Sequence, residues 1–271
     1  NSGRVENQMR TANPIILLVG KTGSGKSTLG NCLLGKAHND GPFYTSASME
    51  SVTDECCVAT TLINNTIYDV VDTPGIFDTQ QNIDETLKKI AKAVNKSDHG
   101  VKAILVVFEA YRFTNEQKEV LSRIRDFLGK DATNHIIAVF SHANKRQTEC
   151  KEEMKKAWNK PVQSFIQNVG NRWGISPNPD IFLPNDPVYG ARLMEIKELI
   201  NDIQGVYATE RLEKNLREQE KDRLRKEEED RRERSEYEKR LKESARKETE
   251  EKHRRKIDRF NRGNSDKAVR R

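Results

Sequence analysis

The stretch that decides the fold is Ile15-Ile16-Leu17-Leu18-Val19, followed at once by Gly20-Lys21-Thr22-Gly23-Ser24-Gly25-Lys26-Ser27-Thr28. An apolar run of the buried-strand type leads into a loop with the pattern G-x-x-x-x-G-K-[ST], and a helical pattern begins directly after it. Glycines allow backbone N–H groups to turn toward an anion, and the helix N-terminus adds partial positive charge. The sequence therefore predicts a loop that holds the phosphates of a nucleoside triphosphate.

The side chains of this loop supply the remaining contacts. Lys26 can reach the β- and γ-phosphates, and the Ser27 hydroxyl lies where Mg²⁺ needs an oxygen ligand. The alternative for the same residues is a glycine-rich turn with an exposed lysine. The predicted nucleotide-binding residues of the loop are Gly20, Lys21, Thr22, Gly23, Ser24, Gly25, Lys26, Ser27 and Thr28.

A second motif, Asp72-Thr73-Pro74-Gly75, ends the strand-like run 66–71. An aspartate at a strand end beside a phosphate loop can hold Mg²⁺ through its water shell. Gly75 allows the backbone to approach the γ-phosphate closely, so that its N–H can bond there. The segment 76–83 is then expected to be a switch that becomes ordered on the γ-phosphate.

A second switch is expected in the long polar stretch between the first helix and residue 56. A threonine there would close over Mg²⁺ when triphosphate is bound, and the candidates are Thr45 and Thr53, of which Thr53 is preferred. The alternative is an ordinary mobile loop. The predicted metal ligands are Ser27, Thr53 and Asp72.

Apolar runs and amphipathic stretches alternate from residue 15 to about 205, which predicts β-α units. Only two of the runs are joined by a short turn, Ile63-Asn64-Asn65, which predicts a hairpin and one antiparallel edge strand. The fold class is therefore α/β, a mostly parallel sheet with helices on both faces, and ligands are expected beyond the carboxyl ends of the strands. The expected strands are 15–19, 56–62, 66–71, 101–108, 135–140 and 179–183, and the expected helices are 26–35, 83–97, 115–129, 149–170 and 189–204.

Charge divides the 271-residue chain into two parts. The net charge is +6, and all of it falls on 206–271, because acidic and basic residues balance over 1–205. The basic balance therefore does not predict a nucleic-acid-binding head. The four cysteines show no zinc spacing, and no apolar run is long enough to span a membrane, so we expect a cytoplasmic setting. The chain begins without a methionine, which is compatible with a trimmed terminus and a membrane anchor outside it.

The segment 206–262 is predicted to form a continuous solvated helix. Apolar residues are sparse and keep no heptad, which argues against a strong coiled coil. Thirteen of its 17 acidic residues have Lys or Arg four positions later, the order that stabilises helices. A disordered charged tail is the alternative, and a basic contact with anionic lipid near 252–256 is compatible with either. Basic residues without interleaved aromatic residues do not predict specific nucleic-acid binding.

The motifs together resemble the AIG1 family of immunity-associated GTPases, relatives of septins and of chloroplast import GTPases. The resemblance rests on the phosphate loop, Ser51-Val52-Thr53, Asp72–Thr79 and the box Tyr111-Arg112-Phe113-Thr114-Asn115-Glu116. It implies a domain over 13–205 that binds GTP or GDP with Mg²⁺ and dimerises face to face across its nucleotides. It also favours Thr53 as the switch threonine. Residues 1–12 are expected to be a flexible segment and 263–271 a disordered tail.

The base-recognition motif departs from the usual N-K-x-D. After the 135–140 run the chain has Ser141-His142-Ala143-Asn144, and Asn144 offers one carbonyl acceptor where an aspartate would accept two hydrogen bonds from guanine. His142 can stack on the purine or be a loop histidine without a ligand. Asn185 resembles the last nucleotide motif of the family. Guanine specificity is thus implied by the resemblance.

The usual catalytic glutamine is also missing, because Ile76 follows Gly75 and cannot orient water. We therefore expect slow intrinsic hydrolysis. Across a dimer, Arg112 can act on the neighbour's phosphates as an arginine finger, or it can be a surface arginine that bonds Glu109 or Glu116. Arg112 and Thr53 are the candidate catalytic residues.

Two functions follow from these expectations. The first is a GTP-dependent switch with slow, dimer-stimulated GTP hydrolysis. The second is a non-hydrolysing scaffold that forms a homodimer or oligomer on GTP, while 206–262 presents protein partners or contacts a membrane surface. A phosphate-loop kinase is a third possibility, against which the Asp72–Gly75 motif argues.

Overall fold

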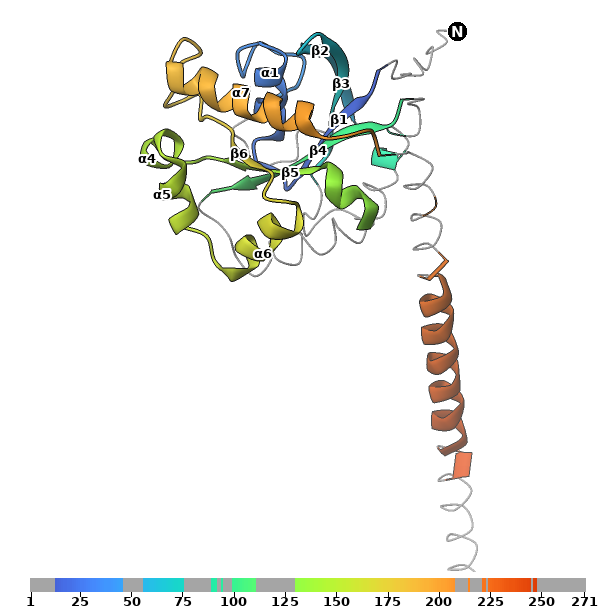
Figure 1. Ribbon diagram of the computed structural model, residues 1–271. Coiled ribbons are helices and arrows are strands. Elements are labelled where there is room, and N and C mark those ends of the chain that lie inside the picture. The colour runs from blue at the N-terminus through green and yellow to red at the C-terminus, as the bar shows by residue number, and fades with distance from the viewer. Residues whose placement is uncertain are drawn as a thin grey trace, which may run out of the picture. The chain divides into compact units, whose positions relative to one another are not determined.

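A computed structural model of the chain describes residues 13–45, 56–75, 89–91, 94, 99–110, 130–207, 214, 221–222, 224–244 and 246–247. The chain divides into two compact units between Leu216 and Arg217, and each unit is considered by itself. The first contains the sheet and its covering helices (Figure 1), and the second consists of charged sequence.

The first unit is built on one sheet of six strands in the order β2-β3-β1-β4-β5-β6. Every neighbouring pair is parallel except β2 with β3, which is antiparallel. The predicted fold class, a mostly parallel sheet with one antiparallel edge, is confirmed. The strands are β1 (Ile15–Gly20), β2 (Cys57–Ile63), β3 (Thr66–Asp72), β4 (Val101–Glu109), β5 (Ile136–Ser141) and β6 (Trp173–Ile175).

The apolar runs occupy the centre of the sheet because both of its faces are covered. All residues of β1 and β5 are buried, as expected where helices cover a parallel sheet on both sides. The edge strand β2 instead has an exposed face. The hairpin between β2 and β3 turns at Asn64 and Asn65, whose φ angles of 47° and 62° fit the left-handed conformation that asparagine tolerates.

Helices cover both faces of the sheet (Figure 1). Leu29 of α1 and Ile196 of α7 pack with Ile16 and Leu18 of β1 in one core cluster. Met154 of α5 and Ile166 of α6 belong to a second cluster on the other face. The helices are α1 (Lys26–Leu33), α4 (Lys145–Glu149), α5 (Lys151–Lys156), α6 (Lys160–Asn168) and α7 (Pro187–Asp202), and a 3-10 helix spans Lys130–His135.

The predicted strand at 179–183 is wrong, and the sixth strand is the three-residue β6 at Trp173–Ile175. Residues 179–183 instead belong to a turn that Asn178 organises, since its backbone oxygen accepts hydrogen bonds from the N–H groups of Ile181 and Phe182. A proline also lies at 177, 179 and 184, and proline cannot donate to a central ladder. Sequence periodicity missed β6 because it is short and has glycine at its centre.

The single helix predicted over 149–170 is also wrong, because the structure has separate helices there. Cys150 is extended between α4 and α5, and Asn159 caps a new helix by accepting a hydrogen bond from the Val162 N–H. Proline at the start of α6 fits a helix beginning. Of the helix predicted over 83–97, residues 89–91 and 94 are described and are helical, and 115–129 lies outside the described residues.

The sheet domain extends along the chain to Tyr207, whose backbone bridges Val101 in both directions with N···O distances of 2.7 and 2.9 Å. This bridge lies beyond the limit of 205 expected from composition. In the second unit, residues 224–244 are helical and exposed, and ion pairs four residues apart join Glu228 to Arg232 and Glu243 to Lys247. Among the described helices none is long and apolar enough to cross a membrane. The ranges 1–12, 252–256 and 263–271 lie outside the described residues.

Candidate functional site

The loop between β1 and α1 has the close-packed backbone that phosphate binding requires. A side chain at Gly20 would lie 2.5 Å from the Val107 carbonyl oxygen of β4, so only glycine fits there. Gly25 caps α1 in the left-handed conformation with φ 85°, which strains any residue with a Cβ. The helix therefore begins directly at the loop, and its first N–H groups are available to an anion.

Lys26 spans the loop from inside. Its side chain is 6% exposed, and its Nζ donates a hydrogen bond of 3.0 Å to the backbone oxygen of Lys21. The hydroxyl of Ser24, in the same loop, is buried and has no hydrogen-bond partner among the described residues. A buried cation and a buried donor that lacks a partner suit a loop whose normal partner is an anion.

Ser27, in the first turn of α1, meets Asp72, the last residue of β3. The Ser27 hydroxyl donates to Asp72 Oδ2 at 2.6 Å, and Asp72 Oδ1 is buried without a hydrogen-bond partner in the described part of the chain. Burial raises the pKa of Asp72, which the positive charge of Lys26 and the hydrogen bonds from Ser27 and the Thr73 backbone partly oppose. A hydroxyl beside a carboxylate with an unpartnered oxygen fits a divalent cation.

Few further potential metal ligands lie near this pair in the described part of the chain. The described residues contain no cluster of three or more His, Cys, Asp or Glu side chains that could hold a metal. Mg²⁺ commonly takes one or two protein ligands and completes its octahedron with phosphate oxygens and water. The site therefore fits a cation that is bound together with a phosphate ligand.

Thr73 fastens the segment after β3 to the neighbouring strand β1, a role for which the Asp72–Gly75 motif carries no signal. Its buried hydroxyl donates to the Leu18 backbone oxygen at 2.7 Å. Gly75, at the end of this described segment, is also buried. The Asp72–Gly75 motif thus lies against β1, next to the phosphate loop.

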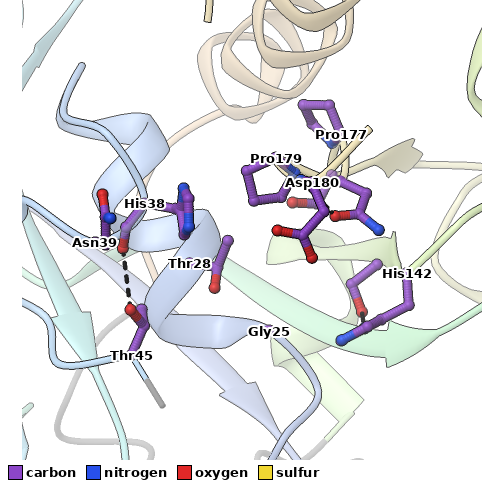
Figure 2. Close-up of a pocket in the computed structure, with 12 residues that line it drawn as sticks. Gly25, Thr28, His38, Asn39, Thr45, His142, Pro177, Pro179 and Asp180 are labelled. Carbon is purple, nitrogen blue, oxygen red and sulfur yellow. Dashed lines mark hydrogen bonds between the residues drawn. The ribbon is translucent and has the colours of Figure 1, made fainter. Parts of the chain in front are cut away.

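A pocket of about 370 Å³ opens beside the loop (Figure 2). Its walls come from the start of α1, from the loop after α1 and from the segments that follow β5 and β6. The lining residues are Gly25, Thr28, His38, Asn39, Thr45, Ser141, His142, Ser176, Pro177, Asn178, Pro179 and Asp180. In the sheet, β3 lies on one side of β1, whereas β5 and β6 lie on its other side. The Ser27–Asp72 pair on the β3 side and the pocket on the β5 and β6 side therefore flank the loop on opposite sides. A nucleotide with its phosphates on the loop would direct its nucleoside into this pocket.

Ser141 and His142 link the pocket to the phosphate loop. Ser141 Oγ lies 2.6 Å from the Ser24 backbone oxygen and 2.9 Å from His142 Nδ1. Ser141 Oγ also lies 3.0 Å from the Phe108 backbone oxygen, and its single proton can serve only one of these acceptors. The φ of His142 is 52°, which holds its ring in the pocket lining.

Two of the expected base-recognition residues are outside the pocket lining. Asn144 is exposed and caps α4: its Oδ1 accepts from the Gln147 N–H at 2.8 Å, while Gln147 Oε1 accepts from the Asn144 N–H at 3.0 Å. Asn185 is exposed next to Asp186, the N-cap of α7. The pocket instead contains Asn178 and Asp180. They escaped notice because the last strand was predicted at 179–183, which includes Asp180 and begins directly after Asn178, whereas β6 ends before both residues.

The loop 37–45, which contributes the opposite wall, is held by a buried side chain of α1. Asn31 is fully buried, and its Nδ2 donates to the backbone oxygens of His38 and Phe43 at 2.8 Å each. Its Oδ1 accepts from the Phe43 N–H at 3.1 Å. Thr45, one candidate switch threonine, lines the pocket and donates to the His38 oxygen at 3.3 Å. The loop wall is therefore built in advance of any ligand.

Thr53, Ile76 and Arg112 lie outside the described residues. Of the predicted site residues, the structure brings Lys26, Ser27 and Asp72 together, and it places Gly25, Thr28 and His142 at the pocket.

Comparisons with known proteins agree with this arrangement. The AIG1 family model matches residues 15–228. The chain is 33% identical over 152 residues to immune-associated nucleotide-binding protein 13 of Arabidopsis thaliana, covering 55% of this chain and 43% of that protein. It is 31% identical over 182 residues to GTPase IMAP family member 8 of Mus musculus, covering 63% of this chain and 24% of that protein. The match thus spans less than half the length of either relative.

Solved structures share the fold at low sequence identity. Toc33 from Arabidopsis thaliana in complex with GDP and Mg²⁺ matches with a TM-score of 0.51 and 15% identity over 74% of this chain and 89% of that one. Its complex with Mg²⁺ and GMPPNP matches with a TM-score of 0.50 and 16% identity, over 73% and 89% of the two chains. At this identity the likeness establishes the fold.

Proposed function

Because this chain belongs to the AIG1 family, we propose that it binds guanine nucleotide with Mg²⁺, switches and dimerises on GTP, and hydrolyses GTP slowly with stimulation by the dimer. The observation that carries the proposal is the Ser27–Asp72 pair, whose buried Asp72 Oδ1 has no partner among the described residues. An unpartnered buried carboxylate oxygen beside a glycine-rich helix start is explained by a cation that accompanies phosphate.

The residues of the site divide the binding between them. Backbone N–H groups of the loop and Lys26 hold the phosphates, while Ser27 and Asp72 hold Mg²⁺. When bound, Mg²⁺ neutralises charge that develops on the phosphates during transfer. Lys26 releases the Lys21 carbonyl and turns to the phosphate oxygens, which replaces a neutral acceptor by a charged one. Thr53 and Gly75 complete the γ-phosphate contacts and couple them to the two switch segments.

Hydrolysis requires a contribution from outside one head, because the chain has Ile76 where a glutamine would orient water. Arg112 from a second copy is our candidate for that contribution. Relatives support a role for dimers: dimerisation is important for the GTPase activity of the chloroplast translocon components atToc33 and psToc159. A positive charge beside the transferred phosphoryl group stabilises the negative charge of the transition state and so lowers the barrier to hydrolysis, with no proton transfer by the arginine.

The alternative is a scaffold that oligomerises on GTP without hydrolysing it, and Ile76 is the observation that favours it. In that case 206–262 presents protein partners or contacts a membrane surface. The exposed, charge-paired helix at 224–244 suits either activity.

Phosphate release measured against protein concentration, with GTP and ATP in parallel, separates these functions. A steep rise of GTP turnover per protein with concentration supports the dimer-stimulated enzyme, and binding with negligible turnover supports the scaffold. Lys26→Ala is the negative control, since it removes the cation of the loop. Arg112→Ala with undiminished turnover at high concentration would remove the arginine from the mechanism. ATP bound as tightly as GTP would refute guanine recognition.

A further inference from the structure

The pocket beside the phosphate loop contains one carboxylate with no role so far, that of Asp180. It is the single acidic side chain among the twelve that line the pocket. We propose that Asp180 is the specificity-determining residue for guanine and accepts hydrogen bonds from the N1–H and N2–H₂ groups of the base. This inference rests on the proposed function, since it takes a guanine nucleotide as the occupant.

The strand order directs the base toward Asp180. The Ser27–Asp72 pair marks the phosphate end at β1 and β3, and the segment 176–180 follows β6 at the other side of the sheet. The nucleoside therefore extends from the loop past Thr28 toward Asp180. Figure 2 shows the Asp180 carboxylate directed into the space between Thr28 and His142.

The segment that carries Asp180 is held in place. Asn178 Oδ1 accepts a hydrogen bond of 2.9 Å from the Asp180 N–H, and the Asn178 backbone oxygen accepts from the Phe182 N–H at 2.9 Å. Phe182 is buried at 1% exposure, which anchors the turn in the core. Prolines at 177 and 179 restrict the backbone further. A recognition group on such a segment loses little freedom when it binds.

The Asp180 carboxylate has no hydrogen-bond partner in the described part of the chain, whereas the side-chain oxygen of Asn144, the residue expected from the motif, already accepts a hydrogen bond. Within the described part of the chain the Asp180 side chain makes no hydrogen bond or ion pair, but Asn144 Oδ1 already accepts the Gln147 N–H. A carboxylate accepts and cannot donate, so it matches the two donors on this edge of guanine. Adenine presents an acceptor at N1 and no donor at C2, so it leaves the carboxylate unpaired. Sites built on such hydrogen bonds reject the unmatched ligand strongly.

The experiment is competition by GTP, ITP, XTP and dGTP against a fluorescent GTP analogue on the full chain, for wild type, Asp180→Ala and Asp180→Asn. ITP lacks the 2-amino group, and XTP carries a carbonyl there. Wild type should prefer GTP over ITP by roughly tenfold, and Asp180→Ala should bring this ratio close to one. Asp180→Asn should lose GTP affinity by roughly 10- to 100-fold and gain XTP affinity, because an amide accepts from N1–H and donates to the C2 oxygen.

Asp40→Asn is the matched control. Asp40 is an exposed carboxylate on the neighbouring loop, it does not line the pocket, and its change alters net charge equally. It should leave the affinities for all four nucleotides unchanged. Because Asp180 is also exposed, neither variant should alter the melting temperature.

Two results overturn the inference and leave the proposed function intact. In the first, the wild type binds GTP, neither variant changes the ratio of GTP affinity to ITP affinity, and Asp180→Asn does not gain XTP affinity. The other is a change in the GTP-to-dGTP ratio alone, which would assign Asp180 to the ribose. A wild type that binds none of these nucleotides contradicts the proposed function itself.

Discussion

Replacing Asn31 with alanine tests whether the pocket wall at 37–45 depends on one buried side chain. Asn31 is fully buried in α1 and bonds to both backbone groups of Phe43, which is itself 1% exposed. Its second donor bond goes to the His38 oxygen, which Thr45 also contacts. Alanine therefore leaves the backbone N–H and C=O of Phe43 without these hydrogen-bond partners, while the His38 oxygen keeps the hydrogen bond from the Thr45 hydroxyl.

The magnitude follows from these two groups. An orphaned buried polar group costs about 1 to 3 kcal/mol, so Asn31→Ala should lower the free energy of unfolding by about 2 to 6 kcal/mol. Asn31→Asp keeps the acceptor but loses the donor, places a carboxylate near two carbonyl oxygens and should be no better. Asn39→Ala, an exposed asparagine of the same loop, should change stability by less than about 0.5 kcal/mol.

Urea unfolding followed by tryptophan fluorescence measures the effect. Trp158 and Trp173 both lie in the first unit and contact each other at a ring distance of 4.8 Å, so the signal reports the sheet domain alone. Nucleotide affinity should fall together with stability, because the same loop lines the pocket. A loss below about 1 kcal/mol in Asn31→Ala would refute the reasoning, since it would mean that the loop is held by other contacts.

Two further predictions concern buried polar groups. Burial raises the pKa of Asp72, so the ionised carboxylate lowers the free energy of unfolding at pH values above that raised pKa. This penalty disappears as the pH falls and the carboxyl group is protonated. Asp72→Asn should therefore raise the melting temperature of nucleotide-free protein at pH 7.5, with a smaller gain at pH 5, and abolish the stabilisation by Mg²⁺ with GTP; a lower melting temperature at pH 7.5 would contradict this. Tyr189→Phe removes the hydrogen bond of 2.9 Å from its hydroxyl to Cys32 Sγ between α7 and α1, and should lower the free energy of unfolding by about 1 kcal/mol in the same urea assay. No loss would mean that this contact adds nothing to ring packing.

Much of the fold was predictable because its signals are local. The buried runs at β1, β4 and β5 and the Asn64-Asn65 turn each follow from the chemistry of a few adjacent residues. The failures lie where local and tertiary preferences diverge. Ile181 and Phe182 look like strand residues, yet Phe182 enters the core from a turn that Asn178 holds. The short β6 forms because β5 offers it a partner edge, and no pattern of its own announces it.

By itself the sequence determined that this chain has a phosphate loop, candidate magnesium ligands at Ser27 and Asp72, and the motifs of the AIG1 family, since glycine spacing and motif order are properties of the chain alone. Only the tertiary structure decided which polar side chains surround the nucleoside. Asn144 matches a motif position, but its side-chain oxygen caps α4 by accepting the Gln147 N–H. Asp180 matches no motif, yet it lines the pocket. The physical reason is that a hydrogen-bonding group serves a ligand only if the fold leaves it unpartnered and correctly directed. Both conditions depend on residues far away along the chain.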